Sequence, residues 1–207
     1  MRPTMLKIAA MGSTLRAGSV NQGLIRAAMG LGPQHNLEIV PVNLNLPLFN
    51  QDLEPDNVPE SVLAMHRQID SADAVLFSVA EYNYSLSSVL KNAIDWASRT
   101  YLPGKKNHPL LGKPCALVGA GGGMGTSRAQ YHLRQVLVFL DMHPLNKPEV
   151  FVQRWGAPAG GERFNKDGDL TDDATRDKLG TMLAAFEQWI RVFQTDDDDA
   201  TECVDNE

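Results

Sequence analysis

Ala74-Val75-Leu76-Phe77-Ser78-Val79 is the strongest candidate for a buried strand in this sequence, and a polar segment, residues 80–86, follows it. An unbroken apolar run of this length is typical of a strand that is buried on both faces of a sheet. On either side of it, short apolar runs alternate with segments whose apolar residues recur every three or four positions. This alternation predicts a parallel sheet that carries helices on both faces.

Four more strands and five helices complete the predicted α/β chain. The other strands are expected at residues 5–11, 37–42, 114–119 and 145–152. The helices are expected at residues 20–31, 58–69, 87–98 and 128–140, and from a cap at Thr171 or Asp172 to about residue 193. Strict alternation of this kind predicts a flavodoxin-like, doubly wound, five-stranded parallel sheet with the strand order 2-1-3-4-5.

The bulk composition fits one domain in the cytoplasm. The chain has 207 residues, of which 43% are hydrophobic, so residues 1–193 are expected to form a single domain. Residues 194–207 are expected to be an acidic, disordered tail. No apolar run approaches the roughly 18 residues that span a membrane, and no signal peptide opens the sequence. The net charge of -6 disfavours nucleic-acid binding.

The first of three unusual loops, residues 12–21, lies between a strand and a helix start. Its polar side chains are those of Ser13, Thr14, Arg16, Ser19 and Asn21, and no acidic residue occurs before position 38. Hydroxyl, amide and guanidinium donors beside the free N–H groups of a helix start suit a phosphate. The loop matches neither the P-loop nor the dinucleotide pattern, which favours a terminal monophosphate. The alternative is an ordinary loop that Ser19 caps.

The second and third loops follow the next two strands of the predicted order, and ligands of such sheets bind at this edge. The second loop contains Glu81, Tyr82, Asn83, Tyr84 and Ser85, whose aromatic faces and amide suit a planar heteroaromatic ring. The third loop, residues 119–127, contains the glycine run Gly121, Gly122 and Gly123, which lets a ligand or backbone approach closely. The alternatives are simple loop packing and a flexible connection.

Catalytic and metal-binding clusters are not apparent elsewhere. The five histidines have no ligand-like spacing, so no metal site is expected. Neither Ser13 nor Ser19 has a histidine base near it in the sequence, which favours chemistry that a bound cofactor carries. Lys91 and Asp95, four positions apart on one predicted helix, are expected to pair on its surface.

Four segments resemble the NAD(P)H-dependent FMN reductases, a family that includes bacterial chromate and quinone reductases and plant quinone reductases. They are EYNYS at 81–85, LKNAIDW at 90–96, QYHLRQ at 130–135 and NKPE at 146–149. The resemblance runs from about residue 6 to residue 152 and implies bound FMN with NADPH or NADH as co-substrate. It places Ser13, Arg16, Ser19 and Asn21 at the phosphate, and residues 81–84 and 121–123 at the ring.

The same resemblance implies an activity and an assembly. Hydride would pass from NAD(P)H through flavin N5 to a quinone or another small acceptor, such as flavin, chromate, a ferric chelate or an azo compound. A homodimer or homotetramer is implied, with Arg128, Tyr131 and Glu149 in a polar network between subunits; a local pairing on the helix surface is the alternative. A flavodoxin-type electron carrier and a non-catalytic flavin or redox sensor remain alternative functions.

Overall fold

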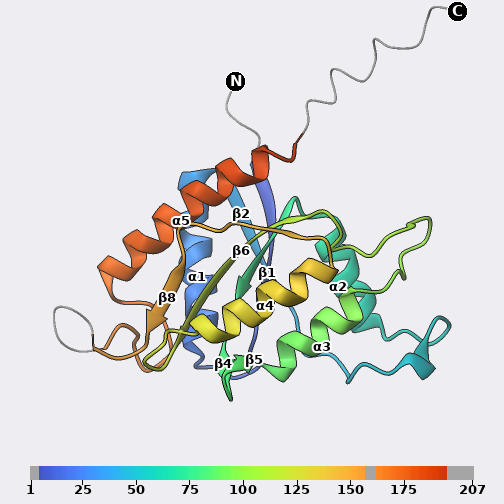
Figure 1. The fold of residues 1–207 in the computed structure, drawn as a ribbon, viewed down its shortest axis with the longest axis horizontal. Coiled ribbons are helices and arrows are strands. Elements are labelled where there is room, and N and C mark those ends of the chain that lie inside the picture. Colours follow the sequence, from blue (N-terminus) through green and yellow to red (C-terminus); the bar gives the residue numbers. More distant parts are fainter. Residues whose placement is uncertain (1–4, 157–161, 195–207) are drawn as a thin grey trace, which may run out of the picture.

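The computed structural model describes residues 5–156 and 162–194, so the predicted tail lies outside the described residues except for Gln194. Its parallel sheet has the order β2-β1-β3-β6-β7, and β8 continues the outer strand by pairing with β6 (Figure 1). The strands are β1 (Leu6–Gly12), β2 (Leu37–Val42), β3 (Ala74–Ser78), β6 (Pro114–Gly121), β7 (His143–Pro144) and β8 (Val150–Gln153). The predicted order is therefore confirmed.

Helices cover both faces of this sheet, each over its own hydrophobic core. The helices are α1 (Val20–Leu31), α2 (Glu60–Asp70), α3 (Ser88–Ala97), α4 (Ser127–Phe139) and α5 (Asp173–Arg191), with short 3-10 turns at η1 (Gly32–His35) and η2 (Gln51–Leu53). Apolar residues of α1 and α5 form one core with the sheet, whereas those of α2, α3 and α4 form the other. β3 is buried on both faces, as its unbroken apolar run predicts.

The predicted fifth strand, residues 145–152, is wrong as a continuous element. The structure has two short strands there, β7 and β8, both paired with β6. Between them, Arg134 of α4 donates hydrogen bonds to the Leu145 carbonyl at 2.8 Å and to Asn146 Oδ1 at 3.0 Å. Pro148 has no N–H group, so it cannot donate a backbone hydrogen bond to a neighbouring strand. Leu145 still donates its N–H to the Cys115 carbonyl of β6 at 2.7 Å, so the pairing breaks between Leu145 and Val150, where Arg134 holds the start of the segment on α4.

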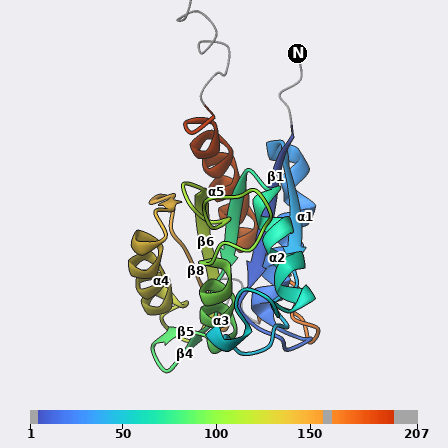
Figure 2. The ribbon, with the colours of Figure 1, turned by 90° about the vertical axis from the view of Figure 1, so that its right-hand side faces the viewer.

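The second loop contains a hairpin that the sequence did not predict. β4 (Glu81–Tyr82) pairs antiparallel with β5 (Ser85–Leu86), and Figure 2 shows the hairpin beside the ends of α3 and α4. Asn83 and Tyr84, with φ of 50° and 67°, form its two-residue turn. Two successive left-handed residues match the twist of a tight hairpin, and asparagine tolerates this conformation well.

Smaller expectations about helix ends and surface pairs can also be compared with the structure. Asp172, not Thr171, caps α5 by accepting the Thr175 N–H at 2.9 Å. Lys91 and Asp95 pair at 2.6 Å, as predicted.

Within the described ranges, no helix combines the length and the apolar character that crossing a membrane requires.

Candidate functional site

Ser13 joins the first loop to the second at the carboxyl edge of the sheet. Its hydroxyl donates to the Ser78 carbonyl at 2.6 Å and accepts the Ala80 N–H. The Ser87 hydroxyl in turn donates to the Ser13 carbonyl at 2.6 Å. Ser13 and Ser87 are both buried, so these hydrogen bonds fix the two loops against each other.

Asn21 joins the start of α1 to the strand that leads into the third loop. Its Nδ2 donates to the Ala120 carbonyl and its Oδ1 accepts the Ala120 N–H, each at 2.9 Å. The Ser78 hydroxyl donates to the Asn21 carbonyl at 2.8 Å. Ser13 and Asn21 therefore hold the three loops together from inside. A contact of either side chain with a phosphate stays a prediction.

Two other polar residues of the first loop border a cavity of about 400 Å³. Thr14 and Arg16 line it, and the Arg16 guanidinium is exposed, donating to the Gly18 carbonyl at 2.6 Å. Ser19 caps α1 by accepting the Asn21 N–H at 3.2 Å, and this is the capping role that the sequence offered as the alternative to phosphate binding. The cavity is thus bordered by hydroxyl and guanidinium groups, a donor set that suits an anion.

The second loop exposes its tyrosine rings while its carboxylate points inward. Glu81 accepts hydrogen bonds from Arg128 Nε at 2.7 Å and from the Ala129 N–H at 3.2 Å. The second bond caps α4, whose N-cap residue makes no side-chain cap of its own. Tyr82 and Tyr84 are 56% and 66% exposed, and the Arg128 guanidinium carbon lies 3.7 Å from the centroid of the Tyr84 ring. Glu81 is thus an anchor for a loop with aromatic faces open to solvent.

The glycines of the third loop divide into packed and open positions. A Cβ on Gly121 would lie 2.9 Å from Thr126 Cγ2, so this position is packed. A Cβ on Gly122 would meet only Trp155, at 3.9 Å, and one on Gly123 would meet nothing within 4 Å. Open space at the tip of this loop leaves room for a ring beside the backbone.

Two residues of this region were not singled out in the sequence. Ser87 directly precedes a helix, where a capping serine is common, and it does cap α3 by accepting the Leu90 N–H at 3.2 Å. Gln153 of β8 donates from Nε2 to the Gly123 carbonyl at 2.7 Å. No local pattern marks Gln153, because its partner lies 30 positions away.

The three residues expected between subunits make contacts within this chain. The Tyr131 hydroxyl donates to Glu149 Oε1 at 2.6 Å, and Lys147 pairs with the other oxygen of Glu149 at 2.6 Å. The hydrogen bond from Lys147, followed by that from Tyr131, lowers the pKa of Glu149. Arg128 pairs with Glu81 instead. The local pairing is therefore present, and an intersubunit role stays a prediction.

The combined chemistry of the loops fits flavin mononucleotide. The first loop offers a cavity with hydroxyl and guanidinium donors, while the hairpin and the open glycines offer flat, accessible surfaces. Loop-to-loop hydrogen bonds through Ser13 and Asn21 keep these surfaces at one edge of the sheet. A phosphate end and a ring end are thus available on one rigid frame.

Comparisons with known proteins agree with this reading. The family model for NADPH-dependent FMN reductase matches residues 6–157. An NAD(P)H-dependent FMN reductase of Pseudomonas aeruginosa is 43% identical over 188 residues, which cover 90% of this chain and 96% of that protein. An NAD(P)H:quinone oxidoreductase of Solanum tuberosum is 43% identical over 187 residues, which cover 88% and 92% of the two chains.

A solved structure supports the same conclusion. The flavoenzyme NAD(P)H:(acceptor) oxidoreductase FerB of Paracoccus denitrificans superposes with a TM-score of 0.78 at 34% identity, over 91% of this chain and 98% of that one. The likeness thus covers more of the chain than the family model, which ends at residue 157. The family that the motifs predicted is confirmed: the chain belongs to the NADPH-dependent FMN reductases.

Proposed function

We propose that this chain is an FMN-dependent oxidoreductase that takes hydride from NADPH or NADH and reduces a quinone or another small acceptor, such as free flavin. The observation that carries the proposal is the meeting of an anion-suited cavity, an exposed tyrosine hairpin and an open glycine turn at one sheet edge. When bound, FMN supplies the two-electron redox chemistry that no side chain of the site provides.

The residues of the chain bind and orient that cofactor. Arg16 and Thr14 would hold the phosphate, aided by the positive end of the α1 dipole. Tyr82, Asn83 and Tyr84 on one side, and Gly121 to Gly123 on the other, would border the ring. The ion pair with Arg128 compensates the charge of Glu81, so the second loop places no unpaired carboxylate beside the ring. Exposure of the hairpin leaves the ring edge accessible to small acceptors of different shapes.

The finer expectations about assembly and location belong to the same proposal. We infer a homodimer or homotetramer in the cytoplasm, with Tyr131 and Glu149 at a subunit contact. Tyr131 is 51% exposed and already hydrogen-bonded to Glu149, so a partner could extend this network without rebuilding it. Arg128 could join by exchanging part of its contact with Glu81.

An Arg16→Ala variant tests the phosphate end. Hydrogen bonds to charged groups contribute about 1.5 to 3 kcal/mol, so the variant should bind FMN about tenfold more weakly or worse, measured by quenching of flavin fluorescence. Lys106→Ala, at an exposed position in the segment after α3, is the matched control and should bind as the parent does. Equal affinity in all three proteins would contradict the assignment of Arg16.

Anaerobic mixing with NADPH and then NADH tests the reaction. The visible absorbance of the bound flavin should bleach with at least one of them and return when a quinone is added. If neither coenzyme bleaches the flavin of a fully loaded protein, the electron-carrier alternative replaces the reductase. If the protein cannot be loaded with FMN at all, the sensor alternative does.

A further inference from the structure

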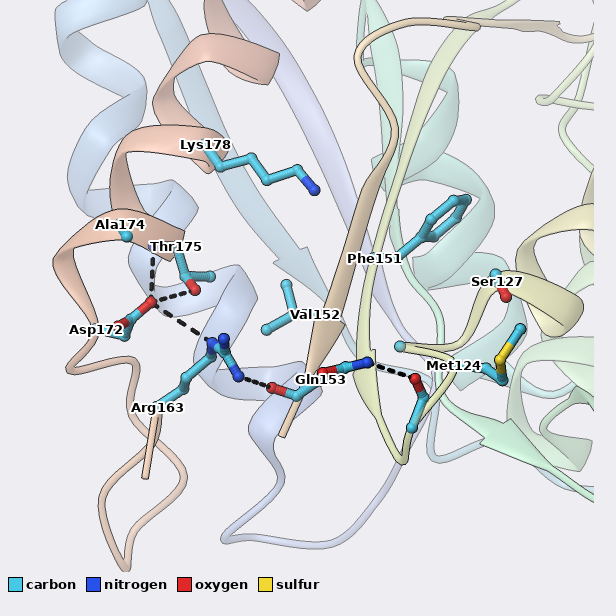
Figure 3. A pocket seen from close by; sticks show the side chains of 12 residues that line it. Met124, Ser127, Phe151, Val152, Gln153, Arg163, Asp172, Ala174, Thr175 and Lys178 are labelled. Atoms are coloured by element: carbon cyan, nitrogen blue, oxygen red, sulfur yellow. Dashed lines mark hydrogen bonds and ion pairs between the residues drawn. The ribbon is translucent and has the colours of Figure 1, made fainter. Parts of the chain in front are cut away.

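A second cavity, of about 540 Å³, lies at the outer edge of the sheet, between the third loop and the first turns of α5 (Figure 3). Its walls come from residues 123–127, from residues 151–153 of β8 and from residues 172–178. Within the described chain, it contains no residue of the first or second loop, and it shares only Gly123 with the predicted ring site. This cavity is therefore distinct from the proposed flavin site.

The floor of the cavity is apolar. Its hydrophobic surface has two sides: Met124 and Phe151, whose ring lies 6.1 Å from that of Tyr131 of α4, contribute one side, and Val152 and Ala174 of α5 contribute the other. Met124 is 53% exposed although it is a large apolar side chain. Methionine adapts its shape to flat ligands, and a phenylalanine ring offers a face or an edge for stacking. Such a floor suits a planar ring system.

Two of the three charged groups that line the cavity neutralise each other. Arg163 donates to the carbonyl groups of Gln153 at 2.9 Å and Trp155 at 2.8 Å, and its Nε lies 3.7 Å from Asp172. Asp172 also accepts the N–H and the hydroxyl of Thr175. The hydrogen bonds from Thr175, as the largest cause, lower the pKa of Asp172, which keeps this carboxylate ionised beside Arg163.

Lys178 is the third charged group, and no described residue compensates its charge. No hydrogen bond or ion pair links it to another residue in the described ranges. Figure 3 shows its side chain extending from α5 across the cavity toward β8, above Val152. The cavity thus combines an apolar floor with one free ammonium group, for a net lining charge of +1 from Arg163, Lys178 and Asp172.

We propose that this cavity is a binding site for a planar aromatic carboxylate, whose ring lies along the outer edge of β8 between Phe151 and Val152 and whose acid group meets Lys178. Its volume falls within the roughly 300 to 1,000 Å³ typical of small-molecule sites. A monoanion matches the single free cation, whereas a phosphate dianion would retain an uncompensated charge over an apolar surface. The proposal goes beyond the reductase activity, because the site needs neither flavin nor coenzyme.

Isothermal titration calorimetry of 2-naphthoate into the FMN-loaded protein tests the site. One equivalent of 2-naphthoate should bind. Neutral 2-naphthamide should bind about fivefold more weakly, because it lacks the negative charge, whose attraction to an exposed lysine contributes roughly 1 kcal/mol of binding free energy. Lys178→Met keeps the apolar stem and should remove this preference. Ala174→Trp should abolish binding by filling the cavity. Lys106→Met, an exposed lysine outside the cavity, is the control and should bind as the parent does.

Each other outcome overturns the proposal. The first is that the parent does not bind 2-naphthoate. The second is that Lys178→Met binds it as the parent does and keeps the preference over 2-naphthamide, or that Ala174→Trp binds it as the parent does. The third is that the FMN-free protein binds 2-naphthoate and that this binding is lost once FMN is loaded. The last result would place the probe in the flavin site. If Ala174→Trp does not fold, Lys178→Met still decides the question, because its side chain is exposed and makes no contact that folding requires.

Discussion

Two regions of the molecule assemble the same three side-chain types, a glutamate, an arginine and a tyrosine, with opposite results. In the first, Glu54 receives two hydrogen bonds from Arg99, at 2.8 and 2.6 Å, and one from the Tyr101 hydroxyl. We call this the closed triad. In the second, the open triad, Glu81 pairs with Arg128, whose guanidinium stacks on the exposed ring of Tyr84.

The difference lies in what each triad leaves available. In the closed triad the tyrosine hydroxyl is bonded and the ring packs 4.9 Å from His66 and 6.1 Å from Trp96, centroid to centroid. The hydrogen bond from Arg99 is the largest cause that lowers the pKa of Glu54. In the open triad the carboxylate is bonded but the ring remains at the surface. Residue type alone therefore does not mark a ligand site; unsatisfied and exposed groups do.

Removing each glutamate should separate the two roles, with the largest effect on stability in the closed triad. Glu54→Ala should lower the free energy of unfolding by about 2 kcal/mol and should leave FMN affinity unchanged. The loss is smaller than that expected for three fully buried hydrogen bonds to a charged group, because Arg99 is partly solvated. Glu81→Ala loses the cap of α4 and should cost about 1 kcal/mol. It should also weaken FMN severalfold, because Arg128 and the hairpin lose their anchor.

Urea unfolding and FMN titration of both variants measure these effects. The comparison fails if Glu54→Ala weakens FMN as much as Glu81→Ala does, since the closed triad would then support the flavin site. It also fails if Glu81→Ala leaves FMN affinity at the parent value.

Removal of the tyrosine hydroxyls should give a smaller contrast. Tyr101→Phe breaks the bond to Glu54 in a partly buried place and should cost about 1 kcal/mol of unfolding free energy. Tyr84→Phe should change stability by less than about 0.5 kcal/mol, because the ring is exposed and its contact with Arg128 uses the face. Thermal unfolding in one buffer suffices, and equal losses in the two variants would contradict the distinction.

The sequence singled out the members of the open triad but not their pairing, because it expected Arg128 at a subunit contact instead of at Glu81, and it singled out no member of the closed triad. Residues 81–85 follow the most apolar strand, and the carboxyl edge of a parallel sheet is where ligands bind, so local pattern and topology agree there. The ion pairs of both triads are long-range: Glu81 and Arg128 are 47 residues apart, and the closed triad joins positions 45 and 47 residues apart. Such pairs depend on tertiary packing, which single-sequence patterns do not contain.

The same reasoning explains the partial success elsewhere. All five helices follow from local periodicity, and the strand order follows from the doubly wound fold that their alternation with strands indicates; the structure confirms both. The break in the outer strand depends on Arg134 of α4, a contact between separate elements, so the apolar run suggested one strand where there are two. Likewise, Ser13 lies in the first loop and Asn21 in the first turn of α1, and their bonds to Ala80 and Ala120 could not be read from spacing.

The smallest effect should come from pH, through His66 beneath the closed triad. Its Nε2 hydrogen-bonds the Trp96 carbonyl at 2.9 Å, and burial is the largest cause that lowers its pKa below the ordinary value of 6.5. The folded state therefore binds fewer protons than the unfolded state, so this contribution to stability is complete above about pH 6.5 and is lost as the pH falls below it. At pH 6 the loss is at most about 0.8 kcal/mol, the limit that the ordinary value of 6.5 sets for the unfolded state. His66→Gln, which keeps an amide donor for Trp96, should be less sensitive to acid than the parent in urea unfolding at pH 7.5 and pH 6. His132→Gln, at an exposed position beside the open triad, is the control. Identical pH dependence in the parent and in both variants would mean that burial does not hold His66 neutral.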